Sequence, residues 1–478
     1  MVKKFIIENF LGGINPNSKY YGENVYQAGI GINPFQRDEE MGDTATGWGS
    51  TQLGAAIITT TIGQMVPTDV SGDGQKIYAY SPTKIYQINA STGVVSDNAT
   101  YPLTITNGAV IGGMMYFKSR MLYGNGNTQI GIFTPGATPA QTDAQFTGFG
   151  SSTRRPMAQG FETAYIANGN QIATITDPTS GSSLNLNALD LPTGFLISDI
   201  EFWDDKIFIA GTEDTTSNAS IPGAVIYLWD GFSESWFAEY RLPESYIRNL
   251  KIFKGTIVAQ GAEYLYSYTG NGFQPFYYVG SGITSRPNLV GRGVEAGSLD
   301  LFKQFLIYPN SDGDLVTIGS LNPGETTKVA IPFKAPTAEQ QNAILVVGEK
   351  IWYSLANNTL YTFSAGSNQT SITLSTKEFV FASPVHFVGM RVNFQRLASG
   401  DSMTVNMINA SDGASTAVGT ITFASDGGSV ISKYLMPSAD VRVSAFHLNF
   451  VFNAGSLALK PKVTVYYQEI PEPYHVAV

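Results

Sequence analysis

The segment Ile197-Ser-Asp-Ile-Glu-Phe-Trp-Asp-Asp-Lys-Ile-Phe-Ile-Ala-Gly211 decides the fold, because a second segment aligns with it without a gap. That second segment is Ile247-Arg-Asn-Leu-Lys-Ile-Phe-Lys-Gly-Thr-Ile-Val-Ala-Gln-Gly261. Each copy holds an apolar, β-rich run, a tight turn at Asp204-Asp205 or Lys254-Gly255, and another β-rich run. Two such runs joined by a two-residue turn predict a β-hairpin.

Drifted copies of this hairpin recur along the middle of the chain, at 73–78, 117–123, 166–172, 302–307 and 347–352. Their turns are spaced by about 46 residues, and four-stranded propeller blades repeat at ~40–50 residues. A second pattern, in which Tyr lies between apolar residues, follows the hairpin in most units, at 85–88, 226–229, 265–268 and 360–363. Each unit is therefore expected to be a small antiparallel meander.

One meander cannot bury both of its faces, whereas several meanders packed radially can. We therefore predict an all-β chain with a six- or seven-bladed β-propeller at 59–374, where the weak copy at 166–172 leaves the blade count open. A two-sheet sandwich or a solenoid of hairpins is the alternative. A sandwich rarely repeats one unit so often, and a β-helix has much shorter coils.

Both ends of the chain lack the repeat. Residues 1–58 are rich in turn formers, which predicts an extended N-terminal arm that adds a strand to close the ring or docks on a neighbouring subunit. Alternating strands separated by polar turns predict a C-terminal β-sandwich at 375–470. Closely spaced prolines predict an extended tail at 471–478.

Composition excludes several classes of protein. The chain has 478 residues and no Cys, so neither disulfides nor Cys-based zinc sites can form. Its net charge of −10 gives no general attraction for nucleic acid or anionic membranes. No apolar run approaches the ~20 residues of a membrane span. The apolar run after Lys3-Lys4 is too short for a signal peptide, so we expect the protein to be made and first kept in the cytoplasm.

The residues that could carry chemistry favour structural roles. His386, His447 and His475 are isolated from one another in the sequence. The loops 69–74 and 310–314 resemble the front half of a calcium loop, but their twelfth position would be Tyr80 or Leu321 where such loops have a bidentate Glu. Ordinary hairpin turns explain both loops better.

Some acidic and aromatic residues could form a sugar site. Glu201, Asp204 and Asp205 could imitate the carboxylates of a glycosidase, but the counterpart of the aspartates in the next unit is Lys254-Gly255, as in a variable turn. Five aromatic residues could stack on a sugar, but they recur at blade positions typical of interblade core: Trp229, Trp236, Tyr266, Tyr268 and Phe276. We therefore predict no catalytic residue, no cofactor and no metal ion.

The opening Asn9-Phe10-Leu11-Gly12-Gly13-Ile14-Asn15 is similar to the F-x-G-G-[LI]-N beginning of tail nozzle, or tail hub, proteins of short-tailed bacteriophages. The order of arm, propeller and sandwich, with strands at 389–394 and 441–450, also resembles such hubs. The resemblance implies a structural virion protein without catalytic residues, located in the tail. It implies a six-fold homo-oligomeric ring that contacts the adaptor, portal and fibre proteins and forms part of the channel for DNA ejection.

An acidic chain suits this role, because each neutralised phosphate would add an attraction that slows the passage of DNA. We expect Glu201, Asp204 and Asp205 to contribute negative potential to the ring. Two other functions stay open: a receptor- or glycan-binding tail-tip or adhesin propeller, and a propeller glycan hydrolase, which would need carboxylates that converge at the axis.

Overall fold

The computed structural model describes 2–7, 26–30, 32–33, 43–44, 48–68, 75–105, 113–126, 128–150, 155–213, 223–278, 299–309, 314–320, 328–333, 341–348, 350–355, 359–365, 372–376, 378–393, 399–423, 432–453 and 462–470. The chain divides into two compact units. One comprises 52–313 and 337–362, and the other comprises 1–51, 314–336 and 363–478.

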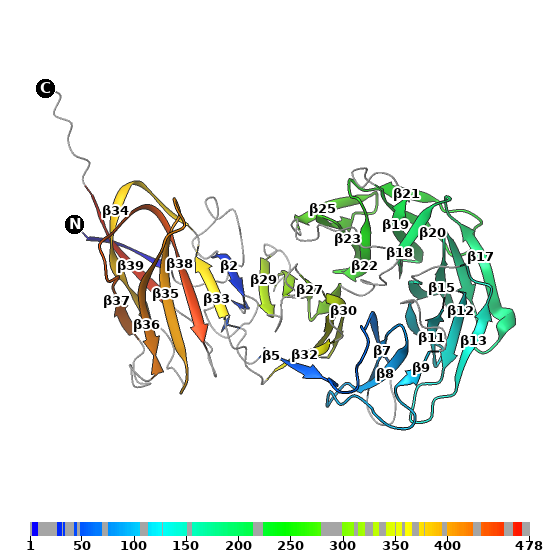
Figure 1. Ribbon diagram of the computed structural model, residues 1–478. Helices are drawn as coiled ribbons and strands as arrows, with labels where there is room; N and C mark the ends of the chain where they lie inside the picture. Colours follow the sequence, from blue (N-terminus) through cyan, green and yellow to red (C-terminus); the bar gives the residue numbers. More distant parts are fainter. Residues whose placement is uncertain are drawn as a thin grey trace. The chain divides into compact units, whose positions relative to one another are not determined.

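Seven four-stranded antiparallel sheets within the described residues form a seven-bladed β-propeller, which confirms the predicted fold class and resolves the blade count (Figure 1). The first three blades are β6 (Gln64–Pro67), β7 (Lys76–Tyr80), β8 (Lys84–Asn89) and β9 (Leu103–Thr104); β10 (Met114–Phe117), β11 (Arg120–Asn125), β12 (Gln129–Phe133) and β13 (Gln141–Thr147); and β14 (Met157–Gly160), β15 (Thr163–Asn168), β16 (Gln171–Ile175) and β17 (Leu184–Asp190). A 3-10 turn, η1 (Gly181–Ser183), precedes β17.

The other four blades follow the same plan. They are β18 (Phe195–Trp203), β19 (Lys206–Glu213), β20 (Ala224–Trp229) and β21 (Ala238–Arg241); β22 (Ile247–Phe253), β23 (Thr256–Gly261), β24 (Tyr264–Tyr268) and β25 (Phe273–Tyr278); β26 (Asp300–Phe302), β27 (Phe305–Pro309), β28 (Leu315–Gly319) and β29 (Lys328–Phe333); and β30 (Gln341–Val347), β31 (Lys350–Leu355), β32 (Thr359–Ala365) and β5 (Trp48–Leu53). The seventh blade thus takes its fourth strand from the residues expected as the N-terminal arm.

Blades are held together by apolar clusters between their faces. In β7, Ile77 and Ala79 belong to the cluster shared with the seventh blade, whereas Tyr78 and Tyr80 belong to the cluster shared with the second blade. This division follows from the period of two in a β-strand, which sends successive side chains to opposite faces. A central strand such as β20, with the sequence AVIYLW, is apolar and buried at every position because both of its faces are covered.

The two-residue turns that carry the sequence repeat join the first and second strands of a blade. Asp204 and Asp205 have φ of 51° and 56°, and Lys254 and Gly255 have 50° and 76°, as a type I′ hairpin turn requires. The predicted hairpins at these positions are confirmed.

The weak repeat at 166–172 does not mark the first turn of the third blade, as its alignment with the other copies predicts, but the second. Gly169 lies in the turn between β15 and β16, which are the second and third strands of the third blade. The equivalent turn is Phe161-Glu162, between β14 and β15. Neither of its residues is a usual turn former, so turn chemistry gave no signal there.

The remaining strands form a separate nine-stranded sheet in the unit that contains the C-terminus. Six strands lie in the order β1 (Val2–Ile7), β39 (Lys462–Glu469), β34 (Phe379–Asn393), β38 (Val441–Asn453), β33 (Ile372–Thr376) and β2 (Tyr26–Ile30). Of the other three, β35 (Ser402–Asn409) pairs with β38 and β36 (Ser415–Thr422), and β37 (Ser432–Leu435) pairs with β34. Strands β3 (Ile32–Asn33) and β4 (Asp43–Thr44) pair with each other.

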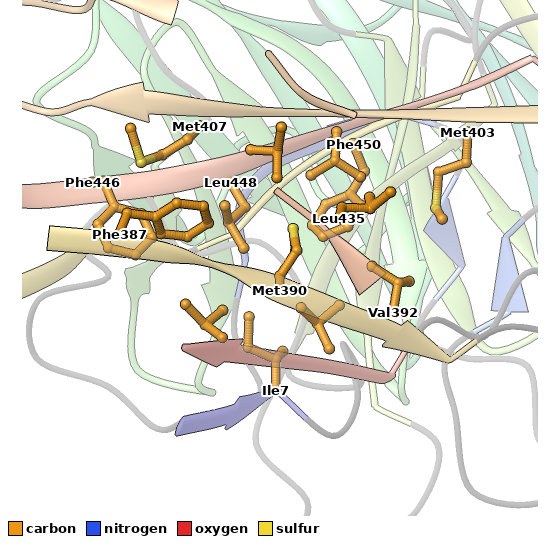
Figure 2. Packing of buried hydrophobic residues seen from close by; sticks show 14 of the residues in the cluster. Ile7, Phe387, Met390, Val392, Met403, Met407, Leu435, Phe446, Leu448 and Phe450 are labelled. Atoms are coloured by element: carbon orange, nitrogen blue, oxygen red, sulfur yellow. The ribbon is translucent and has the colours of Figure 1, made fainter. Parts of the chain in front are cut away.

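A two-sheet sandwich stays a prediction, because hydrogen bonds connect all nine strands in one network. The alternating apolar residues that predicted the sandwich do form one core, in which Met390, Val392 and Phe387 of β34 lie near Leu448 and Phe450 of β38 (Figure 2). Ile7 of β1 is 3 % exposed in the same core, so a strand of the expected arm is part of this unit.

Candidate functional site

The inner strands of the propeller carry a group of four closely spaced charged residues that are half-buried or buried. First strands of neighbouring blades contact one another, as β14, β18 and β22 do, and as β26, β30 and β6 do. Asp199 and Glu201 lie on β18, Lys251 lies on β22, and Asp300 lies on β26. We name these four residues the inner-strand cluster.

Each carboxylate with a described hydrogen bond ties one blade to the next. Asp199 Oδ2 accepts a hydrogen bond from the Leu250 amide of β22 at 2.7 Å. Asp300 Oδ2 accepts one from the Val346 amide of β30 at 2.7 Å, and its Oδ1 lies 2.7 Å from Lys251 Nζ. The cluster therefore links four successive blades, the fourth to the seventh.

A side-chain amide links the first two blades in the same way. Gln64 Oε1 on β6 accepts a hydrogen bond from the Met114 amide on β10 at 2.6 Å. Inner-strand amides that face the next blade would otherwise lack a strand partner, and a buried, unpaired N–H costs about 1–3 kcal/mol. Side-chain acceptors at these positions thus stabilise the closed ring.

Electrostatics within the cluster follow from burial and close spacing. Asp199 and Glu201 are two residues apart and project to the same side of β18. Burial first, and then the nearby Asp199 carboxylate, raise the pKa of Glu201 from 4.5 to about 7, while Lys251 opposes the shift. Burial disfavours the ammonium form of Lys251, but Asp300 and then Glu201 and Asp199 outweigh it and raise the Lys251 pKa.

Buried cations also lie outside this cluster, and one of them, Arg155, precedes β14. Arg155 is 1 % exposed and its guanidinium donates to the carbonyls of Gly150 at 2.6 Å and Ala167 at 3.3 Å. It also lies 4.8 Å from the centroid of the Phe149 ring. Burial lowers its pKa to about 10. These contacts fix the chain that enters the third blade.

The candidate carboxylates of the sequence analysis do not come together. Glu201 is in the inner-strand cluster, whereas Asp204 and Asp205 lie in the exposed turn after β18, where Asp204 pairs with Lys206 at 2.8 Å. The described residues hold no group of three His, Asp or Glu side chains arranged to bind a metal ion. Most of each calcium-like loop, 69–74 and 310–313, lies outside the described residues.

Four of the five aromatic residues that could stack on a sugar pack between blades, as predicted. Trp229 belongs to the cluster between the third and fourth blades, and Trp236 packs against it. Tyr266 and Tyr268 belong to the cluster between the fourth and fifth blades. Phe276 differs, because it lies on the outermost strand β25 and is 40 % exposed.

The histidines are dispersed. His386 Nε2 lies 2.7 Å from Asp440 Oδ1 on the surface of the C-terminal sheet. His447 is half-buried in β38, where burial lowers its pKa. His475 lies outside the described residues.

An exposed aromatic group on the third and fourth blades was not predicted. The Phe161 ring centroid lies 4.9 Å from Phe202 and 5.0 Å from Phe232. Phe161 is 36 % exposed and Phe232 is 72 % exposed. We name Phe161, Phe202 and Phe232, with the exposed acids Glu162 and Glu234 in the same loops, the Phe161–Phe232 patch.

Both loops of this patch hold their aromatic residue outward. Phe161 has φ of 47°, which is a genuine outlier for a bulky residue. The Asp230 carboxylate accepts hydrogen bonds from the amides of Phe232 at 2.9 Å and Ser233 at 2.8 Å. A Cβ on Gly231 would lie 2.6 Å from Tyr165 Oη, so only glycine fits there.

Comparisons with known proteins find likenesses among solved structures alone. No protein-family model matches the chain, and no curated protein matches it. Among solved structures, the WD40 propeller domain of Doa1 has 12 % identity and a TM-score of 0.45, covering 67 % of this chain and 97 % of that one. Virginiamycin B lyase from Staphylococcus aureus has 16 % identity and a TM-score of 0.47, covering 66 % and 99 %. BamB from Moraxella catarrhalis has 11 % identity and a TM-score of 0.36, covering 71 % and 95 %.

The described residues contain no helix with the length and apolar character that crossing a membrane requires.

Proposed function

We propose that this chain is a structural subunit of a short-tailed bacteriophage tail, a nozzle or hub protein that forms part of the channel for DNA ejection. The resemblance at Asn9–Asn15 and the succession of a propeller and a C-terminal β-sheet unit support the proposal. The role needs a rigid wall and no catalytic residue, cofactor or metal ion.

The observation that carries the proposal is the charge and the use of the inner-strand cluster. Three carboxyl groups face one ammonium group, and two of the carboxylates hold the neighbouring blade. Carboxylates used in this way stiffen the ring and give no attraction to phosphate. A protein beside moving DNA benefits from both properties, because neutralised phosphates add salt-dependent affinity.

The charge of the unit that contains most of the propeller points the same way. Residues 52–313 and 337–362 include 23 acidic and 15 basic residues. DNA would therefore pass copies of this unit without sequence-specific binding. A polar surface with few charges also suits wet contacts with other copies and with adaptor, portal and fibre proteins of the virion.

A phage that encodes this chain, grown with a stop codon in its gene, tests the function. We expect particles with a truncated tail that fail to deliver DNA, and we expect the purified chain to restore both the tail density and infectivity. A chain with the exposed Asp97 changed to Lys serves as a control that restores both equally well. Particles that lack the chain but keep a complete tail and infect normally would refute the proposal.

A further inference from the structure

Most of the large apolar side chains that the described residues expose gather at three places. The first is the Phe161–Phe232 patch, and the second is the outer edge of the fifth blade, with Tyr264, Phe276 and Tyr278. The third is the outward face of the nine-stranded sheet, with Val2, Ile6, Tyr434 and Met436. Clustered exposed apolar residues indicate contact surfaces.

Strand register defines the outward face of the nine-stranded sheet. Lys4 pairs with Tyr466, and Tyr466 pairs with Gly389. Two residues further along β34, Arg391 pairs with Tyr434. Their neighbours Ile7, Met390 and Leu435 point into the core, so these side chains point away from it. We name Lys4, Ile6, Arg391, Tyr434 and Tyr466 the Tyr434–Tyr466 face.

This face is pre-formed. The rings of Tyr434 and Tyr466 lie 5.7 Å apart. Arg391 Nε donates to Ser432 Oγ at 2.7 Å, which fixes the guanidinium on the sheet. Arginine and tyrosine that are held in place lose little side-chain freedom on binding, and both are enriched at interface centres.

The Tyr434–Tyr466 face is cationic in an acidic protein. Besides Lys4 and Arg391, the outward strand positions include Arg442 and Lys462, and the described outward positions of β1, β34, β37 and β39 include no Asp or Glu. Asp440 precedes β38, and its carboxylate oxygens lie 2.7 Å from His386 Nε2 and 3.2 Å from Arg442 Nε. A partner of this face should therefore be acidic and offer aromatic groups.

The Phe161–Phe232 patch of the same chain has that chemistry. It exposes two phenylalanine rings beside Glu162, whose side chain is 83 % exposed, and Glu234. Lys118 lies 3.6 Å from Glu162 and offsets only part of the charge. The patch belongs to the unit with the larger excess of acidic residues.

We propose that the Phe161–Phe232 patch of one copy docks on the Tyr434–Tyr466 face of a second copy. The two surfaces differ, so the contact is heterologous, and its repetition gives a ring or an open filament. The contact itself follows from charge and aromatic complementarity. Its place in a tail rests on the proposed function.

Two double variants each disrupt one of the two surfaces of the contact. The patch variant combines Glu162→Lys and Phe232→Ser, and the face variant combines Arg391→Glu and Tyr434→Ser. Light-scattering mass is measured against concentration for each. Wild type should rise above 51.5 kDa, and each variant should need a concentration at least about tenfold higher to do so. Exposed charges elsewhere, Asp97→Lys and Lys303→Glu, serve as matched controls that behave as wild type.

The mass of a mixture of the two variants is the decisive measurement. The patch variant keeps an intact face and the face variant keeps an intact patch, so the mixture should form a dimer of about twice 51.5 kDa and stop there. Circular dichroism of each variant establishes that it is folded. A mixture that stays monomeric, variants that assemble like wild type, or a wild type that stays monomeric at every concentration would each overturn the proposal.

The test also distinguishes a second copy of the chain from a sugar as the partner of the patch. If wild type binds sugars on a glycan array, Phe232→Ser abolishes that binding and the mass is unchanged, then the patch is a glycan site and the proposed contact is wrong. The outcome for the tail is independent, because the chain can restore stop-codon particles whether or not it self-associates in solution.

Discussion

Replacing Glu201 by Gln should stabilise the protein at pH 8 and leave its stability unchanged near pH 4.5. The folded protein raises the pKa of Glu201 from 4.5 to about 7, first through burial and then through the neighbouring Asp199. Below pH 4.5 the carboxyl is protonated in both the folded and the unfolded chain, so it contributes no pH-dependent penalty. Between pH 4.5 and 7 only the unfolded chain releases the proton, and the penalty is complete above pH 7.

The size of the effect follows from the same shift. One pKa unit corresponds to about 1.4 kcal/mol, so ionised Glu201 lowers the free energy of unfolding by about 2–3 kcal/mol once some contact with water is allowed for. Glutamine has the shape of the protonated carboxyl group and cannot ionise. The variant should therefore gain about 2–3 kcal/mol over wild type at pH 8.

Urea unfolding of the full chain, followed by tryptophan fluorescence at pH 5, 6, 7 and 8, measures the gain. The difference between Glu201→Gln and wild type should widen from pH 5 to pH 7 and level off by pH 8. Glu263→Gln, at an exposed glutamate of the next blade, is the control and should show no such widening. A constant difference at all four pH values would refute the raised pKa of the Glu201 carboxyl group on β18.

Three further changes probe other parts of the fold. Glu244 accepts hydrogen bonds from the Glu263 and Tyr264 amides at 3.0 Å and from the Tyr266 hydroxyl at 2.9 Å, so Glu244→Ala should cost about 2–4 kcal/mol in urea unfolding; a loss below 0.5 would contradict it. Phe208→Ala empties part of the core between the fourth and fifth blades and should cost about 3–5 kcal/mol, whereas exposed Phe232→Ala should change stability by less than about 0.5 kcal/mol. Replacing Phe161-Glu162 by Asn-Gly removes two non-glycine-type residues from a left-handed turn, so it should raise the free energy of unfolding by about 0.5–1 kcal/mol. The same change removes the Phe161 ring and should weaken self-association. Unchanged self-association would show that this turn is not part of the contact.

The propeller could be predicted from the sequence because its repeat coincides with its strands. Two-residue turns such as Asp204-Asp205 lie between apolar runs, and the hydrogen bonds follow that pattern. The third blade was misread because Phe161-Glu162 has no turn-forming residue, while Gly169, one strand later, does. The strand that begins at Val2 pairs with residues at the far end of the chain, and no local pattern reports such a partner.

The inner-strand cluster was predicted only in part, for a related reason. Glu201 stood out because it lies close to Asp204 and Asp205 in the sequence, but the strand directs it to Asp199 and Lys251. Asp300 and Lys251 are 49 positions apart and meet only when neighbouring blades align. Spacing along a strand can be read from residues, whereas contacts between blades require the ring to close.

The two surfaces proposed to meet have features that folding alone does not require. Apolar clusters between blades stabilise the propeller, so the excess of acidic residues in its unit adds only self-repulsion to an isolated chain. The Phe161-Glu162 turn likewise holds a bulky residue in a conformation that Asn-Gly would adopt at lower cost. An exposed aromatic ring held in such a turn favours a role in a contact. A second copy that brings Lys4 and Arg391 to the Phe161–Phe232 patch offsets the charge and covers the rings, which is why we place the contact there.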